Sequence, residues 1–211
     1  MGMGNHVSCV ILAAGNSGRM GSHKALLQFG ESRTFIQQLT WVYHLAGAGQ
    51  IIVVCNHALA LYLSDSADFF SYPVELVINS DPETGRFHSL RLGLERVTEG
   101  NCCFFQNVDN PFTSVGLLTL LLESLNDTRA VIPAYCGRPG HPVLIGREMA
   151  GKMLKTTDPD ARIDIFLKST GPEYLEVPYA GILANINTPE EYREVFGRDV
   201  RKENSCIHPP G

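Results

Sequence analysis

The strongest constraint on the fold is the first apolar segment of the chain. Residues Val7–Ala13 read VSCVILA, a nearly unbroken apolar run that stops at Gly15. A strand covered on both faces of a parallel sheet has this composition, whereas a strand with one solvated face alternates apolar and polar residues. Because such a strand needs neighbouring strands and helices on both faces of the sheet, this segment alone favours an α/β domain.

The segments that follow alternate between helical and strand-like patterns. Apolar residues at helical spacing fill residues 34–48, and two glycines then precede the apolar run Ile51–Cys55. This order predicts that strands 7–13 and 51–55 are parallel neighbours. The other expected strands are Glu75–Ile78, Cys102–Val108, Ala130–Ala134, Val143–Ile145 (antiparallel) and Leu175–Val177, and the other expected helices are Ser89–Val97, Val115–Leu125, Arg147–Leu154, Ile163–Leu167 and Pro189–Phe196.

The alternation predicts a single Rossmann-like three-layer α/β domain with a mostly parallel twisted sheet over residues 1–197. The polar tail 198–211 ends in Pro-Pro-Gly and is expected to fray. A chain of 211 residues with 44% hydrophobic residues can bury one core without disulfides. Its six cysteines show no CxxC spacing, so we expect reduced thiols in a reducing compartment.

Charge and hydropathy exclude two classes of partner. The net charge is −5, and no dense run of Lys and Arg provides a surface for nucleic acid. No apolar stretch approaches the roughly 18 residues of a membrane span, and the amino terminus lacks the layout of a signal peptide. We therefore expect a cytoplasmic protein that binds neither nucleic acid nor a membrane.

The loop after the first expected strand carries the candidate chemistry. Residues 12–27 read LAAGNSGRMGSHKALL, with three glycines within seven residues and then Lys24. Glycines let backbone N–H groups approach a phosphate closely. Arg19 adds a planar guanidinium, and Lys24 adds a point positive charge. The GxxGxxG spacing fits neither the P-loop nor the dinucleotide fingerprint. The loop therefore predicts a phosphate site of another kind, with a plain surface turn as the alternative.

Asp109 is the candidate metal ligand. It follows the expected strand Cys102–Val108 and precedes Pro111, which places its carboxylate at the carboxyl end of the sheet, where ligands of open α/β folds bind. Magnesium binds proteins through one or two carboxylates together with substrate phosphates, so a single firm carboxylate suffices. A carboxylate that caps a loop is the alternative interpretation.

These segments resemble the MobA-like nucleotidyltransferases, which attach CMP or GMP to molybdopterin during maturation of the molybdenum cofactor. The loop LAAGNSGRMGSHKALLQFG carries the likeness, and five further segments follow in the family's order: residues 79–94, 108–111, 140–143, 158–162 and 187–191. The resemblance implies a nucleotide-diphospho-sugar transferase-like fold. It also implies a Mg²⁺-dependent enzyme that transfers a nucleoside monophosphate from an NTP to a phosphorylated acceptor and releases pyrophosphate.

The same resemblance assigns the site residues. Candidate catalytic residues are Arg19, Lys24 and Asp109, and the metal ligands would be Asp109 and Asn187. Gly140, His141 and Arg162 are expected on the acceptor side. The expected nucleotide-binding residues are Leu12, Ala13, Ala14, Gly15, Ser17, Gly18, Arg19, Lys24, Asn79, Ser89 and Asp109.

Three of these assignments have structural alternatives. Ser89 would serve as the N-cap of a helix that begins there. Asn187 would simply lead into a helix capped by Thr188, with Pro189 in its first turn. Arg162 would form a surface salt bridge, which contributes little to stability.

The motifs point in two directions on the identity of the nucleotide. Ala14 makes the loop Ala-Ala-Gly, which resembles the cytidylyltransferase branch, whereas Asn185 and Asn187 stand where that branch has aspartates and resemble the guanylyltransferase branch. The motifs together favour CTP, with GTP as the alternative. A molybdopterin-type acceptor and, as a protein partner, a molybdoenzyme or its chaperone are expected. A sugar-phosphate or polyol-phosphate nucleotidyltransferase and a non-catalytic nucleotide-binding regulator remain alternative hypotheses.

Overall fold

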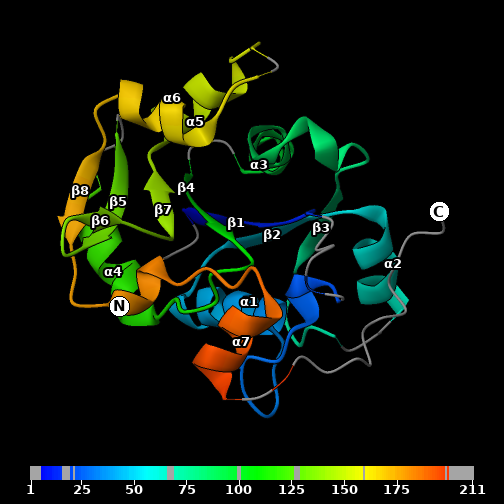
Figure 1. The fold of residues 1–211 in the computed structure, drawn as a ribbon. Helices are drawn as coiled ribbons and strands as arrows, with labels where there is room; N and C mark the ends of the chain where they lie inside the picture. The colour runs from blue at the N-terminus through cyan, green and yellow to red at the C-terminus, as the bar shows by residue number, and fades with distance from the viewer. Residues whose placement is uncertain are drawn as a thin grey trace.

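The structure is a computed structural model that describes residues 6–15, 20, 22–65, 69–98, 101–125, 129–158, 160–197 and 199. One sheet lies between two layers of helices (Figure 1). Its strands are β1 (Val7–Ala13), β2 (Gln50–Cys55), β3 (Glu75–Ile78), β4 (Cys102–Asn107), β5 (Ala130–Tyr135), β6 (Arg138–Pro139), β7 (Val143–Ile145) and β8 (Glu173–Glu176). The helices are α1 (Phe35–Ala46), α2 (His57–Asp65), α3 (Arg86–Leu94), α4 (Val115–Glu123), α5 (Arg147–Leu154), α6 (Ile163–Ser169) and α7 (Pro189–Phe196), with short 3₁₀ turns η2 (Lys24–Leu26), η3 (Pro82–Thr84) and η4 (Ala180–Leu183).

The sheet is mostly parallel, as predicted. Its order is β3-β2-β1-β4-β7-β5-β6, and β8 pairs with β5. The pairs β1–β2, β1–β4, β2–β3 and β5–β8 are parallel, whereas β7 and β6 run antiparallel to their neighbours. The predicted α/β fold and the parallel pairing of the first two strands are therefore confirmed.

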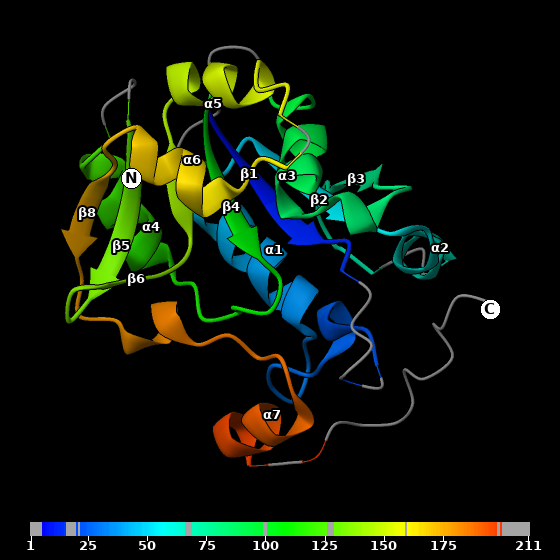
Figure 2. The same cartoon turned by 45° about the horizontal axis from the view of Figure 1, so that its top comes forward.

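The apolar run of β1 is explained by two cores, one on each face of the sheet. Cys9 and Ile11 belong to the core that the sheet forms with α1, α4 and α7, whereas Val10 and Leu12 belong to the core formed with α3, α5 and α6. Figure 2 shows the two helical layers on opposite sides of β1 and β4. Since alternate side chains enter different cores, nearly every position of this strand is apolar, and the buried Ser8 has its hydroxyl hydrogen-bonded to Gln50 and Asn101.

Side-chain caps and glycines set the ends of helices α1 and α7. Thr34 and Gln37 form a capping box at the start of α1, and Gly47 ends that helix in the left-handed conformation, with φ of 83°. Thr188 caps α7 in the same way, so its predicted role as the cap is confirmed. In the described part of the chain, no helix has both the length and the apolar character needed to cross a lipid bilayer.

Two elements differ from the sequence-based expectation. Helix α3 begins at Arg86, three residues before the expected start, because Gly85 adopts a φ of 96° and occupies the N-cap position without a side-chain cap. The interpretation of Ser89 as an N-cap is therefore wrong. Helix α2 was not anticipated; it buries only Leu59, Ala60 and Leu63 against the sheet, which leaves a weak helical pattern in the sequence.

The described cysteines are free thiols. Cys9, Cys55 and Cys103 are buried in the strands, Cys102 is half-buried and Cys136 is exposed. Burial raises the pKa of the Cys55 thiol to about 12, which keeps it protonated and unreactive at neutral pH. The buried thiols act as small apolar side chains of the sheet.

Gly93 sets how closely α3 approaches the sheet. A Cβ at this position would overlap Val10 Cγ1 and lie 3.0 Å from Val54 Cγ2. Gly93→Ala is therefore expected to destabilise the fold by about 1–3 kcal/mol through overpacking. Gly151 in α5 is the matched control, because nothing lies within 4 Å of the position that its Cβ would take, and Gly151→Ala should stabilise by up to about 1 kcal/mol. Urea unfolding of both variants checks this, and equal effects would contradict it.

Candidate active site

The carboxyl ends of β1 and β4 form the floor of a cavity of about 190 Å³, here called the smaller cavity. Leu12 is opposite Asn107 in the parallel register, and the Val108 N–H donates to the Leu12 carbonyl at 3.1 Å. The loops that follow these two strands therefore open at the same edge of the sheet. The cavity is lined by Leu12, Ala13, Ala14, Gly15, His23, Lys24, Arg86, Ser89, Asn107, Val108, Asp109 and Asn187.

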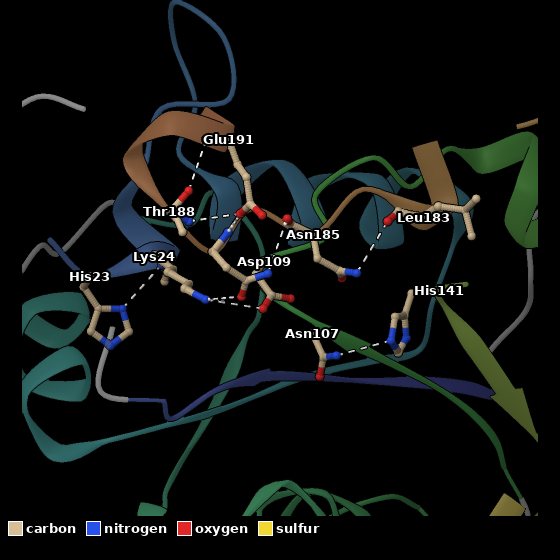
Figure 3. Close-up of polar contacts among 11 residues, drawn as sticks. His23, Lys24, Asn107, Asp109, His141, Leu183, Asn185, Thr188 and Glu191 are labelled. Atoms are coloured by element: carbon tan, nitrogen blue, oxygen red, sulfur yellow. Dashed lines mark hydrogen bonds and ion pairs between the residues drawn. The ribbon is translucent and has the colours of Figure 1, made fainter. Parts of the chain in front are cut away.

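Three polar side chains from distant segments meet at this cavity. The Lys24 ammonium donates to Asn187 Oδ1 at 2.7 Å and lies 3.5 Å from Asp109 Oδ2 (Figure 3). Lys24 begins η2, Asp109 follows β4 and Asn187 precedes α7. A backbone hydrogen bond of 2.8 Å from Ile186 N–H to the Asp109 carbonyl holds the last two segments together. The fold thus brings together three residues that the family resemblance assigned to one site.

The second oxygen of Asp109 is available to a cation. Oδ1 is buried and has no hydrogen-bond partner among the described residues, an arrangement that costs stability until a ligand fills it. Carboxylate and amide oxygens are hard ligands of the kind that Mg²⁺ prefers. No cluster of three or more His, Cys, Asp or Glu side chains that could hold a metal occurs in the described residues. Asp109 and Asn187 therefore fit an ion that takes most of its ligands from substrate and water.

Ser89 and Asn79 occupy different layers of the site. Ser89 lines the smaller cavity from within α3, and its hydroxyl accepts a hydrogen bond of 2.9 Å from Asn79 Nδ2. Asn79 is 1% exposed, and its Oδ1 accepts from the Asp81 N–H at 2.9 Å. Both the nitrogen and the oxygen of the Asn79 amide thus form hydrogen bonds within the protein. Asn79 therefore positions Ser89 and the η3 turn from behind the cavity wall.

A larger cavity of about 560 Å³ adjoins the smaller one. Phe87, Phe105 and Ile182 contribute to its apolar wall. Residues of α6 and β8 also line it. Among the described residues, the basic groups that line it are Arg86, Arg138, Arg162 and Lys168, and the carboxylates are Asp160 and Asp164. An apolar wall with several cations suits an anionic ligand that has an apolar body.

His141 lines the larger cavity, and its imidazole ring is neutral near pH 7. Its pKa is lowered to about 4, mainly by burial; the charge of Asp109 opposes this shift, and the charge of Arg86 adds to it. One ring nitrogen, Nε2, lies 3.2 Å from Asn107 Nδ2, whereas the buried Nδ1 has no partner among the described residues (Figure 3). A neutral ring can donate or accept a hydrogen bond, but it brings no positive charge to an acceptor phosphate.

Gly140 is required by a close backbone approach. Its N–H donates to the Pro133 carbonyl at 2.8 Å, and the His141 N–H donates to the Ile182 carbonyl at 3.1 Å. A Cβ at position 140 would overlap that same Ile182 carbonyl oxygen, which belongs to the backbone and cannot move aside. The glycine therefore brings His141 against η4 and shapes the larger cavity, which is a structural explanation for its place in the motif.

Arg162 lines the larger cavity and is also an ion-pair partner. Its Nε and Nη2 donate to the two carboxylate oxygens of Asp164, each at 3.1 Å, and both side chains are more than half exposed. The hydrogen bond from Arg162 lowers the pKa of Asp164. The salt-bridge alternative is thus present in the structure. Ser17, Gly18 and Arg19 lie outside the described residues, as does nearly all of the tail 198–211.

Arg86 and Asn107 are among the lining residues that were not predicted as site residues, and Asn185 was considered only for its place in the late motif. Asn107 and the preceding Gln106 are polar residues at the end of an apolar strand, and that position was a usable signal. Arg86 follows Gly85 directly, but the expected helix start at residue 89 hid its place. Asn185 lines the larger cavity and Asn187 lines the smaller one, so the two asparagines of the motif belong to different cavities.

The sequence model of the MobA-like NTP transferase domain matches residues 9–173, which include the glycine loop, Asp109 and His141. The chain belongs to this family. The wall between the two cavities, with Asp109 on one side and His141 on the other, therefore lies within the matched MobA-like domain, and Asn187 lies beyond it.

Relatives of this MobA-like transferase include two curated proteins. The molybdenum cofactor cytidylyltransferase of Escherichia coli is 25% identical over 88% of this chain and 93% of its own. Nicotine blue oxidoreductase of Paenarthrobacter nicotinovorans is 28% identical over 77% of this chain and 81% of its own. A solved structure, Rv0371c of Mycobacterium tuberculosis in complex with manganese, has a TM-score of 0.72 at 22% identity and covers 91% of this chain and 98% of that one. The last comparison shows a shared fold.

The MobA-like transferase is expected to lose stability in acid between about pH 6.5 and pH 4. Burial lowers the pKa of His23 to about 4, so below its unfolded value the unfolded chain binds a proton that the folded chain does not. This histidine alone contributes up to about 3 kcal/mol to the free energy of unfolding. The contribution is present above pH 6.5 and is lost as the pH falls toward 4. Urea unfolding across this range should show a shallower pH slope for His23→Gln. An unchanged slope would contradict the assignment.

Proposed function

We propose that this MobA-like nucleotidyltransferase moves CMP from CTP to a phosphorylated acceptor of the molybdopterin type, uses Mg²⁺ and releases pyrophosphate. One observation carries the proposal: Lys24, Asp109 and Asn187 meet at a small cavity that adjoins a larger one. The small cavity offers the groups that bind polyphosphate and a cation. The larger cavity offers room for the acceptor.

Each residue of the smaller cavity has a role in this proposal. The loop amides, Arg19 and Lys24 neutralise the triphosphate. Asp109 and Asn187 hold the divalent ion, which when bound offsets the negative charge that develops on the phosphates. The manganese in the solved mycobacterial structure supports a divalent ion in this fold. Because a phosphate acceptor is already anionic near neutral pH, orientation and charge carry the reaction in place of a general base.

CTP is preferred over GTP in this proposal for two reasons. Ala14 gives the loop the sequence of the cytidylyltransferase branch, and the E. coli relative is named a cytidylyltransferase. GTP is the second candidate, because Asn187 places an amide beside Asp109 where a cytidylyltransferase is expected to have a carboxylate. A sugar-phosphate or polyol-phosphate acceptor is the other alternative. The cytoplasmic location and a molybdoenzyme or chaperone partner stay predictions.

The test measures pyrophosphate release and the product mass with molybdopterin, Mg²⁺ and each of CTP, GTP, ATP and UTP. Because one relative is named for an oxidoreductase, the product itself must be identified. Turnover should be fastest with CTP, and the favoured NTP should stabilise the protein by roughly 2.7 kcal/mol at a hundred times its Kd. A preference for GTP would move the chain to the guanylyltransferase branch. Tight NTP binding without pyrophosphate release from any NTP would favour a regulator and overturn the proposal.

A further inference from the structure

Among the residues that the structure describes, Arg86 and Asn107 line both cavities. Asn107 is neutral and is engaged with the His141 ring. Of these two residues, Arg86 is therefore the one that brings a positive charge to the junction. Lys24 lines only the smaller cavity, and Arg162 lines only the larger one.

The charge of Arg86 is not used by the described part of the protein. Among the described residues, no carboxylate forms an ion pair with it and its side chain makes no hydrogen bond, in contrast to Lys24 beside Asp109 and Arg162 beside Asp164. The residue is exposed, so a ligand can reach the guanidinium. An arginine in this position, on the wall between two cavities, is suited to bind an anion there.

The backbone that carries Arg86 is held in place. Arg86 is the first residue of α3, and the next residue, Phe87, is 5% exposed and packs edge-on against Phe166 with ring centroids 5.6 Å apart. Arg86 thus stands at a fixed helix start on the wall that the two cavities share, with Asp109 lining one cavity and His141 the other.

The reaction brings two phosphates together at such a point. An oxygen of the acceptor phosphate forms a bond to the α-phosphorus of the NTP, the bond from that phosphorus to the bridging oxygen breaks, and its electron pair leaves with pyrophosphate. A dianionic acceptor phosphate has no proton to lose in this step. The two anions repel each other as they approach, so a cation between them lowers the barrier.

We propose that Arg86 binds the phosphate of the acceptor at the junction and holds it in line with the α-phosphate. The acceptor would then be a phosphate monoester whose apolar body lies along Phe87 and Phe105 in the larger cavity. This inference rests on the proposed function and specifies its acceptor side.

Binding of phenyl phosphate, a ring joined to a phosphate, tests the assignment without turnover. Calorimetry on the full chain should show affinity for phenyl phosphate about 10-fold or more weaker in Arg86→Gln than in wild type, because a charge-assisted contact is lost. Affinity for CTP with Mg²⁺ should stay nearly unchanged. Arg96→Gln is the matched control: Arg96 lies just beyond the other end of α3, 3.9 Å from Glu75, and its side chain is 60% exposed.

Three results of this binding experiment would overturn the assignment: absence of phenyl phosphate binding to wild type, equal binding to Arg86→Gln, or a loss confined to CTP. The last result would place Arg86 on the nucleotide. With molybdopterin and CTP, Arg86→Ala should lower kcat/KM for the acceptor about 10- to 100-fold, and millimolar guanidinium should restore part of it. Failure of guanidinium to rescue an impaired variant would indicate a structural role. If wild type itself does not turn over, the proposed function fails, and phenyl phosphate still decides the role of Arg86.

Discussion

Asp109→Asn is expected to lower kcat by a factor of about 10²–10³ or more while the protein stays folded. The substitution keeps the shape of the side chain but removes the charge that faces Lys24 at 3.5 Å and leaves Oδ1 buried without a partner among the described residues. An amide at this position would hold a divalent ion only weakly, because a neutral ligand replaces the one carboxylate that lines the smaller cavity in the described part of the chain.

The measurement for Asp109 has two readouts. Pyrophosphate release gives kcat, and the electron paramagnetic resonance signal of free Mn²⁺ gives ion binding in the presence of CTP. Both should be impaired in Asp109→Asn and unchanged in Glu75→Gln, where an exposed carboxylate 3.9 Å from Arg96 is neutralised far from the cavities. If Asp109→Asn kept the wild-type kcat, Asp109 would have to be removed from the proposed metal site.

Lys24→Met is expected to change two properties in opposite directions. Without the ammonium, kcat/KM for the NTP should fall about 10²-fold, because a charge that faces the triphosphate is lost. The affinity of the nucleotide-free protein for Mn²⁺ should rise, because the same ammonium lies 2.7 Å from Asn187 Oδ1 and 3.5 Å from Asp109 Oδ2 and repels a divalent cation there.

The two effects of Lys24→Met separate its role from a general loss of structure. Mn²⁺ titration without nucleotide measures the ligands of the protein alone, and steady-state kinetics measures the triphosphate contact. Lys152→Met is the matched control, since Lys152 lies on the exposed side of α5. A variant with wild-type kcat/KM would exclude Lys24 from the triphosphate site, and weaker Mn²⁺ binding would contradict competition between the ammonium and the ion.

The strands and most helices were predictable because burial acts on local patterns. The run Val7–Ala13 had to be a central strand, and it is paired on both sides by β2 and β4. Helix α2 was missed, since only three of its residues face the core. The start of α3 was placed too late because a glycine with positive φ can begin a helix without a side-chain cap, which leaves no recognisable motif.

The candidate site was predictable in its residue types more than in its contacts. Lys24 and Asp109 follow directly from a glycine loop and from a polar residue at a strand end. The contact of Lys24 with Asn187 could not be inferred, because it joins positions 163 residues apart and depends on how residues 182–187 cross the sheet edge. The burial that keeps His141 neutral was equally inaccessible, since it comes from surrounding segments.

By itself, the sequence determined an α/β domain with a phosphate-binding loop expected after its first strand, since apolar periodicity and glycine spacing are local properties. Only the tertiary structure decided which side chains share a cavity, which of them face one another, and that Arg86 lies on the wall between two cavities. The physical reason is that desolvation and charge interactions depend on the distance in space between groups, and that distance is set when the separate segments pack together.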